Sequence, residues 1–169
     1  DADAAGQPWL AWCSFPDPHH PMTPPGDWFH RHAAEDMVLP ESRVDTLADA
    51  PEHLRLNRKT HPREQRNWVA PCGYGSEALL REAIAATYGM IEMIDAGVGR
   101  VTRQLEALGI AQDTIIVYTS DHGDMMGEHA RYNKGRPYQS SAGAPLIIRY
   151  PGHIKKKKII KTAYSSPDF

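Results

Sequence analysis

The stretch that decides the fold is Asp113-Thr-Ile-Ile-Val-Tyr-Thr-Ser-Asp-His122. Residues 113–119 are mostly apolar and β-branched, which predicts a buried strand. A carboxylate and an imidazole, Asp121 and His122, follow directly, and Gly123 then lets the chain turn away. In open α/β sheets, ligands bind beyond the carboxyl ends of the strands. The segment therefore predicts a strand whose exit carries a binding site.

Two other short apolar runs, residues 9–15 and 144–150, predict further strands because each is too short for a helix and ends at a proline. Between the first and second strands, residues 76–108 carry apolar side chains at steps of three or four, with Ser76 placed to cap a helix. A strand, a crossover helix and a second strand are typical of a parallel α/β sheet.

The remaining segments predict loops. Five prolines in residues 16–26 exclude a helix there. Residues 27–75 are irregular and polar, and we expect a long excursion that serves as a lid or binding loop. Residues 120–135 are expected to form a binding loop after the second strand. The four lysines at 155–158 are interpreted as a solvated loop.

The composition is that of a globular protein. The 169 residues are 41% apolar and 24% charged, with a formal net charge of −2 and two cysteines. These values exclude collagen, coiled-coil and disordered classes, and two cysteines do not make a disulfide framework. No apolar run is long enough to predict a membrane span, and the near-neutral charge argues against a nucleic-acid partner.

The exits of the first two predicted strands bring ligand-type side chains together. His19 and His20 follow the first strand, and Asp121 and His122 follow the second. In a parallel sheet these exits share one edge. A carboxylate beside an imidazole suits a divalent cation held partly by oxygen. On the dipeptide alone, a purely structural interpretation is equally open, with Asp121 capping the next turn and His122 filling the loop.

Taken together, these motifs resemble the later part of a sulfatase catalytic domain. The resemblance implies an α/β fold of the alkaline-phosphatase-like superfamily, with a mixed, mainly parallel sheet flanked by helices and incomplete in residues 1–169. It runs from end to end and is loosest in the excursion. It is carried by Pro18-His-His-Pro21, which matches a His-x-Pro element, and by residues 90–101, 113–129, Lys134, 144–152 and 162–169.

The resemblance also implies roles for individual residues. Asp121 and His122 would bind a divalent metal, usually Ca²⁺ in sulfatases, with Mn²⁺ or Mg²⁺ as alternatives. Lys134 would bind an oxygen of the substrate sulfate, with contact to the leaving group as a further role. His19, at the His-x-Pro position, would contact the sulfate or protonate the leaving oxygen, whereas His20 is the less favoured of the pair. The implied substrate is a sulfated small molecule or saccharide.

The family nucleophile is a formylglycine made from Cys or Ser in a Cys/Ser-x-Pro/Ala-x-Arg motif. The segments that begin at Cys13 and Cys72 do not fit this motif. We therefore expect the nucleophile upstream of Asp1, installed by a formylglycine-generating enzyme, and we expect residues 1–169 alone to be inactive. Two alternatives stay open: a phosphonate monoester or phosphodiester hydrolase of the same superfamily, and a non-catalytic remnant that keeps the fold and binds a partner.

Overall fold

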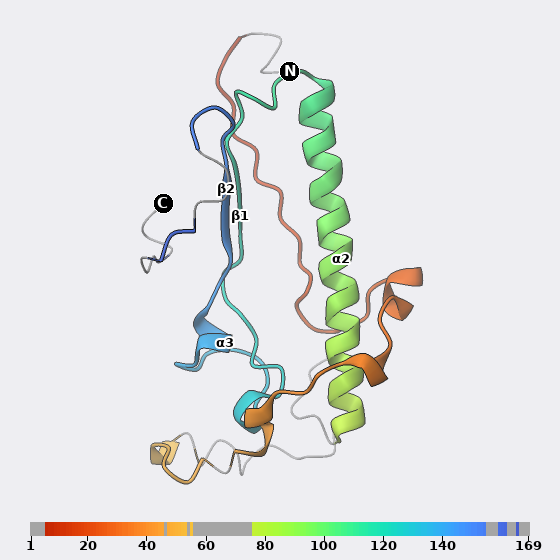
Figure 1. Ribbon diagram of the computed structural model, residues 1–169, viewed down its shortest axis with the longest axis vertical. Helices are drawn as coiled ribbons and strands as arrows, with labels where there is room; N and C mark the ends of the chain where they lie inside the picture. Colours follow the sequence, from red (N-terminus) through yellow and green to blue (C-terminus); the bar gives the residue numbers. More distant parts are fainter. Residues whose placement is uncertain are drawn as a thin grey trace.

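In the computed structural model, one long helix stands beside a two-stranded sheet, and short helical turns cross the lower end of the long helix (Figure 1). The structure describes residues 6–45, 47–53, 55, 76–154, 159–161 and 165. The basic run at 155–158 and residues 56–75 of the excursion, Cys72 among them, lie outside the described residues. In chain order the elements are the 3-10 helices η2 (Gly26–His30), η3 (Ala34–Asp36) and η4 (Glu41–Val44), helix α2 (Glu77–Ala107), strand β1 (Ile116–Thr119), 3-10 helix η5 (Glu128–Ala130), helix α3 (Gln139–Ala142) and strand β2 (Leu146–Arg149).

Helix α2 forms where the sequence predicts it, and its ends have local causes. The Ser76 hydroxyl accepts a hydrogen bond from the Leu79 N–H at 3.2 Å, which satisfies one of the free donors of the first turn. The helix ends at Ala107, and Gly109 follows with a φ of 75°, the left-handed conformation that terminates helices. No helix in the described ranges combines the length and the apolarity that crossing a bilayer requires.

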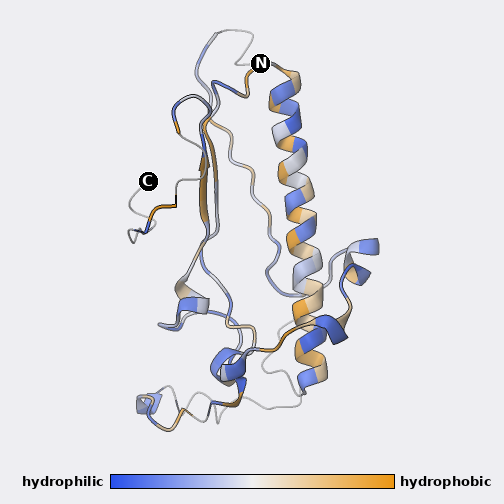
Figure 2. Ribbon diagram, viewed as in Figure 1, coloured by the Kyte–Doolittle hydropathy of each residue, from blue (hydrophilic) through white to orange (hydrophobic). Residues whose placement is uncertain are grey.

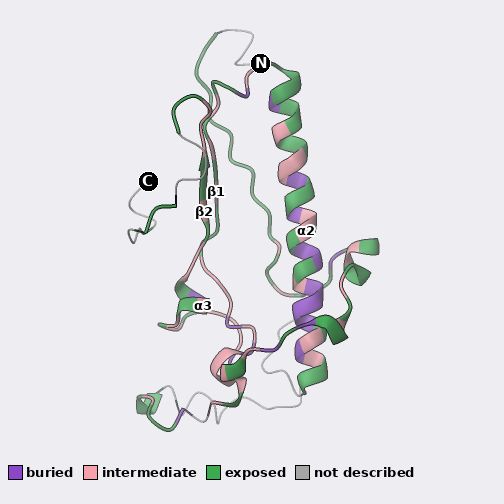
Figure 3. Cartoon of the chain, viewed as in Figure 1, coloured by how far each residue is buried: buried purple, intermediate pink, exposed green. Residues whose placement is uncertain are grey.

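The N-terminal half of α2 carries most of the buried surface (Figure 3). The carbonyl of Trp28 in η2 approaches so closely that a Cβ on Gly89 would lie 2.1 Å from its oxygen. The helix is therefore buried partly through small residues that let other backbone reach it. Four apolar residues of the predicted stripe are exposed instead, and the prediction of one continuous buried stripe is wrong there: Tyr88, Ile91, Val101 and Leu108.

Two small apolar clusters join the loop after β1 to α2. One is built from Met37, Leu39, Leu80, Ile84 and Ala85, and the other from Met22, Ala86 and Met90. The side chain of Met126 packs against both clusters. Because Met126 lies in the predicted binding loop, these contacts fix that loop on the lower half of the helix.

The sheet differs from the predicted one. Strands β1 and β2 pair in antiparallel fashion, with Ile116 opposite Arg149 and Thr119 opposite Leu146. They lie within the predicted ranges 113–119 and 144–150, but the mainly parallel sheet is not seen in the part of the chain that the structure describes. Parallel pairing needs a crossover connection, whereas residues 120–145 fold back and return the chain beside β1.

The prediction of a buried strand at residues 9–15 is wrong. The segment is extended and runs along α2 (Figure 1), but it pairs with no other described strand. The side chains of Leu10 and Trp12 are 93% and 86% exposed, and Cys13, expected to pack as a small hydrophobe, is exposed too. Apolarity predicted burial, but a strand also needs a backbone partner. The sheet itself is apolar (Figure 2), and several of its side chains are likewise exposed.

Candidate functional site

The side chains of His19 and Lys134 meet although they are far apart in the sequence. The Lys134 Nζ lies 2.7 Å from the His19 Nε2, and the His19 Nδ1 lies 2.7 Å from the carbonyl oxygen of His20. A carbonyl oxygen only accepts, so Nδ1 carries the ring proton, and an ammonium only donates, so Nε2 accepts from Lys134. His19 is therefore a neutral imidazole that orients the lysine. The structure thus brings together two of the predicted site residues.

His20 lies beside this contact. Its ring centroid is 3.9 Å from that of His19. Burial lowers the pKa of His20, and the positive charge of the neighbouring Lys134 lowers it further, while the Asp124 carboxylate acts in the opposite direction. His20 therefore favours its neutral form, which leaves Lys134 as the positive charge of this group.

The second pair of predicted residues, Asp121 and His122, lies at the exit of β1. The His122 Nε2 is 3.3 Å from the Asp121 Oδ2, and the His122 Nδ1 is 2.7 Å from the carbonyl oxygen of Gly123. Because that carbonyl takes the Nδ1 proton, the neutral ring turns an unshared electron pair at Nε2 toward the carboxylate. The electron pairs on the His122 Nε2 and the Asp121 Oδ2 then face each other and repel unless a proton or a cation lies between the two atoms.

This donor pair fits a divalent cation. The Asp121 side chain is 85% exposed and leaves its Oδ2 accessible, and a backbone carbonyl fixes the tautomer of His122 as it does in many metal-binding histidines. Across the described residues, however, no three His, Cys, Asp or Glu side chains gather into a metal-binding group. Asp121 and His122 are therefore two candidate donors, and no third such side chain joins them among the residues that the structure describes.

Asp124, which no sequence motif singled out, organises the loop between the two pairs. Its Oδ1 accepts the backbone N–H of Met126 at 2.9 Å and that of Asn133 at 3.1 Å. The carbonyl of Asn133 in turn accepts the N–H of Met125 at 2.9 Å. Both the N–H and the carbonyl of Asn133, the residue before Lys134, are therefore hydrogen-bonded. Only the bond to Met126, two residues on, has a familiar sequence signal, because Asp often closes such local turns.

Gly123 allows a close backbone approach and does not serve as a left-handed turn residue. Its N–H donates to the carbonyl of Ser141 at 2.9 Å, and a Cβ at this position would lie 2.1 Å from the carbonyl oxygen of Ser140. The buried Ser141 hydroxyl accepts the N–H of Arg136 at 3.2 Å. Helix α3 is thereby fixed directly against the Asp121–His122 pair.

His129 joins the same loop to the excursion. Its Nδ1 lies 2.8 Å from the Asp45 Oδ2, its ring stacks on Tyr138 with centroids 4.3 Å apart, and its N–H donates to the Ser42 hydroxyl at 3.3 Å. His129 has a φ of 51°, a left-handed conformation that is uncommon outside glycine. These contacts attach η4 to η5 and to the residue that precedes α3.

With this geometry established, comparison with known proteins identifies the family. A family model described as Sulfatase matches residues 2–169. The chain belongs to the sulfatase family. Among its relatives is an arylsulfatase from Clostridium perfringens, 35% identical over 152 residues, which are 90% of this chain and 30% of that protein. The chain thus spans about a third of the length of this relative.

Solved structures place the chain in the alkaline-phosphatase-like superfamily. A phosphonate monoester hydrolase from Silicibacter pomeroyi superimposes with a TM-score of 0.75 at 29% identity, over 89% of this chain and 30% of that one. The corresponding enzyme of Agrobacterium radiobacter gives a TM-score of 0.68 at 27% identity, over 89% and 31% of the two chains. The folded arrangement of the sulfatase-family chain is therefore shared with enzymes named for phosphonate monoesters.

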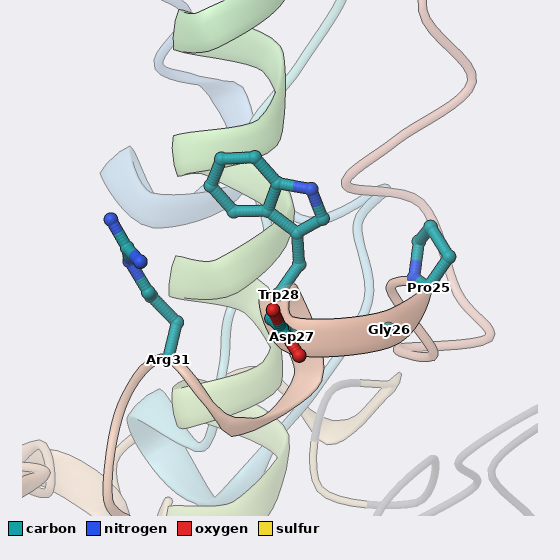
Figure 4. Close-up of a pocket in the computed structure, with 5 residues that line it drawn as sticks. All are labelled: Pro25, Gly26, Asp27, Trp28 and Arg31. Carbon is teal, nitrogen blue, oxygen red and sulfur yellow. The ribbon is translucent and has the colours of Figure 1, made fainter.

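A shallow hollow of about 420 Å³ lies elsewhere on this sulfatase-family chain, beside η2 (Figure 4). The Arg31 guanidinium lies 5.6 Å from the centre of the Trp28 ring, and its Nε donates to the Glu92 carboxylate at 2.8 Å. None of the predicted site residues lines the hollow, which is formed by Pro25, Gly26, Asp27, Trp28 and Arg31. The candidate site is the open loop region around Lys134.

Proposed function

We propose that this chain belongs to a sulfuric ester hydrolase and supplies the groups that bind the sulfate and part of the metal shell. Lys134 and His19 would contact the sulfate of a sulfated small molecule or saccharide, and Asp121 and His122 would hold a divalent cation. The contact between the Lys134 Nζ and the His19 Nε2 is the observation that carries the proposal. It leaves a positive charge oriented by a neutral acceptor in an open loop, which suits an anionic group.

The hydrogen bonds of this contact assign the two residues different tasks. An ammonium has three donors. Among the described residues one donor is used on His19, so two remain for sulfate oxygens. The His19 Nε2 carries no proton in this arrangement, and we therefore assign proton donation toward the leaving oxygen to Lys134 rather than to His19. His19 keeps the ammonium in place. The half-buried His20 favours its neutral form and therefore adds no second positive charge beside the ammonium.

Asp121 and His122 would bind the cation through the carboxylate oxygen and the unprotonated Nε2. A divalent cation, when bound, stabilises negative charge on the transferring sulfuryl oxygens. Oxygen-rich coordination favours Ca²⁺, with Mn²⁺ or Mg²⁺ as alternatives. The remaining ligands and the formylglycine nucleophile would come from outside these 169 residues, and a formylglycine-generating enzyme would produce the nucleophile.

A specific observation favours a second function. The chain superimposes on the Silicibacter pomeroyi enzyme with a TM-score of 0.75, and that enzyme is named for phosphonate monoesters and not for sulfate esters. A phosphonate monoester also presents an anionic group with several oxygens to a lysine and a cation. The same four residues would then serve phosphonate monoester hydrolysis with unchanged roles.

The test compares two substrates on the protein that carries both this chain and the nucleophile. Initial rates with 4-nitrophenyl sulfate and with 4-nitrophenyl phenylphosphonate give kcat/KM for each, and Lys134→Ala is measured in parallel. The proposal expects a higher kcat/KM for the sulfate ester and a loss of both activities in the variant. A preference for the phosphonate supports the second function, whereas turnover of neither ester by metal-loaded protein contradicts both.

A further inference from the structure

We propose that Asp124 is a positioning residue that holds Lys134 against His19 by accepting two backbone N–H groups of its loop. The inference deepens the proposed function, since it names how the sulfate-binding lysine is held in place. It stands on geometry among described residues. Asp124 itself is not assigned a contact with substrate or metal.

Asp124 closes the loop that runs from Met126 to Asn133. The single oxygen Oδ1 of Asp124 accepts from Met126, two residues on, and from Asn133, nine residues on. One carboxylate oxygen therefore joins the two ends of the loop. Hydrogen bonds to an ionised acceptor are stronger than those between neutral groups, which makes Asp better suited than Ser or Thr at this position.

The closed loop holds several residues in a left-handed backbone conformation. Met126 and Asn133 have φ angles of 43° and 65°, and Gly127 between them has a φ of 96°. Left-handed conformations at two non-glycine residues persist only where the surroundings compensate their cost. Both of these residues donate to Asp124, so the carboxylate stabilises two of the four left-handed non-glycine conformations of the loop, the other two being those of His129 and Ala130.

Asn133 fixes the backbone directly before Lys134. The Asn133 N–H donates to Asp124 and its carbonyl accepts from Met125, so the peptide that precedes Lys134 is fixed in position and direction. From this fixed point the Lys134 side chain reaches the His19 Nε2 at 2.7 Å. Loss of the hydrogen bond from the Asn133 N–H to Asp124 would free the backbone at Lys134, and the lysine ammonium would then occupy many positions.

The experiment uses two substitutions of Asp124 and a matched control. Asp124→Ala removes the acceptor, and Asp124→Asn keeps an oxygen that can accept both N–H groups while removing the charge. Asp113→Ala is the control, because it removes an exposed carboxylate at the other end of the β1 strand region. Amide hydrogen exchange at Met126 and Asn133 is measured in the whole protein. We expect exchange to be at least about tenfold faster in Asp124→Ala, intermediate between that variant and wild type in Asp124→Asn, and unchanged in Asp113→Ala.

A second readout separates positioning of Lys134 from general loop stability. In histidine-¹⁵N-labelled protein, the His19 Nε2 resonance reports whether the ammonium still donates to it, and Lys134→Ala gives the reference without that bond. The proposal expects Asp124→Ala to shift the resonance toward this reference and Asp124→Asn to restore it. A wild-type resonance in Asp124→Ala, or a failure of Asp124→Asn to restore it, overturns the proposal. Neither readout requires turnover, so inactive protein with the expected resonances would contradict the proposed function and leave this inference standing.

Discussion

Gly89→Ala should destabilise the fold although alanine is the better helix former. An added Cβ would lie 2.1 Å from the carbonyl oxygen and 3.1 Å from the carbonyl carbon of Trp28, and this backbone cannot rotate away as a side chain could. Overpacking costs about 1–3 kcal/mol, and a contact this short against backbone belongs at the upper end. The gain in helix propensity offsets about 1 kcal/mol. We therefore expect a net loss of about 2 kcal/mol in the free energy of unfolding.

The matched control is Gly99→Ala in the same helix. There the nearest atom to an added Cβ is the end of the flexible Arg103 side chain at 3.3 Å, so we expect a gain of up to about 1 kcal/mol. Thermal and urea unfolding followed by circular dichroism at 222 nm give both values. A loss of about 2 kcal/mol corresponds to a decrease of about 4–8 °C in Tm for a chain of this size. Gly89→Ala protein as stable as wild type would refute the close packing of η2 on α2.

The remaining predictions concern the site. Asp121→Ala should weaken Ca²⁺ binding at least about tenfold in isothermal titration, and unchanged affinity would remove Asp121 from the metal shell. Lys134→Ala should keep the bound metal measured by mass spectrometry while kcat falls at least about 10²-fold, whereas loss of metal would contradict its substrate-side role. The pKa of His20 is lowered in the folded protein, so the unfolded chain binds more protons near the ordinary value of 6.5, and stability should rise with pH through this region and fall below it. His20→Gln should flatten this dependence in urea unfolding at a series of pH values, and an unchanged slope would contradict the assigned cause.

The sequence predicted helix α2 well because its signals are local. The cap at Ser76, the three-and-four spacing of apolar residues and the stop at Gly109 all act within a few residues of one another. The buried face was predicted less well. Trp28 approaches the helix through its backbone at Gly89, and no apolar periodicity encodes a backbone carbonyl arriving from a segment about 60 residues away.

The strand predicted at 9–15 and the predicted parallel sheet are not seen in the described residues, because strand pairing is not decided by local sequence. The apolar run records that these residues suit a buried strand, but pairing depends on which other strands lie alongside. In the structure the run follows α2, where Phe15 contacts the Gly97 position, and β1 pairs with β2 instead. Apolarity therefore indicated a preference, and the tertiary arrangement decided the outcome.

For the candidate site, the sequence indicated the residue types but not their grouping. The adjacency of Asp121 and His122 made that pair visible, and the contact of His19 with Lys134 agrees with both having been singled out. Their roles stay predictions. Asp124 was missed because its decisive bond reaches the backbone of Asn133, and backbone acceptance over nine residues leaves no residue-type pattern.

The most direct test of the central claim is a crystal structure of the protein grown with Ca²⁺ and sulfate, with the metal located by anomalous scattering. The account predicts Ca²⁺ coordinated by Asp121 and His122, and a sulfate within hydrogen-bonding distance of the Lys134 ammonium while that ammonium still donates to His19. Calcium bound elsewhere, or a sulfate held without Lys134, would contradict the assignment of this loop as the site of the reaction.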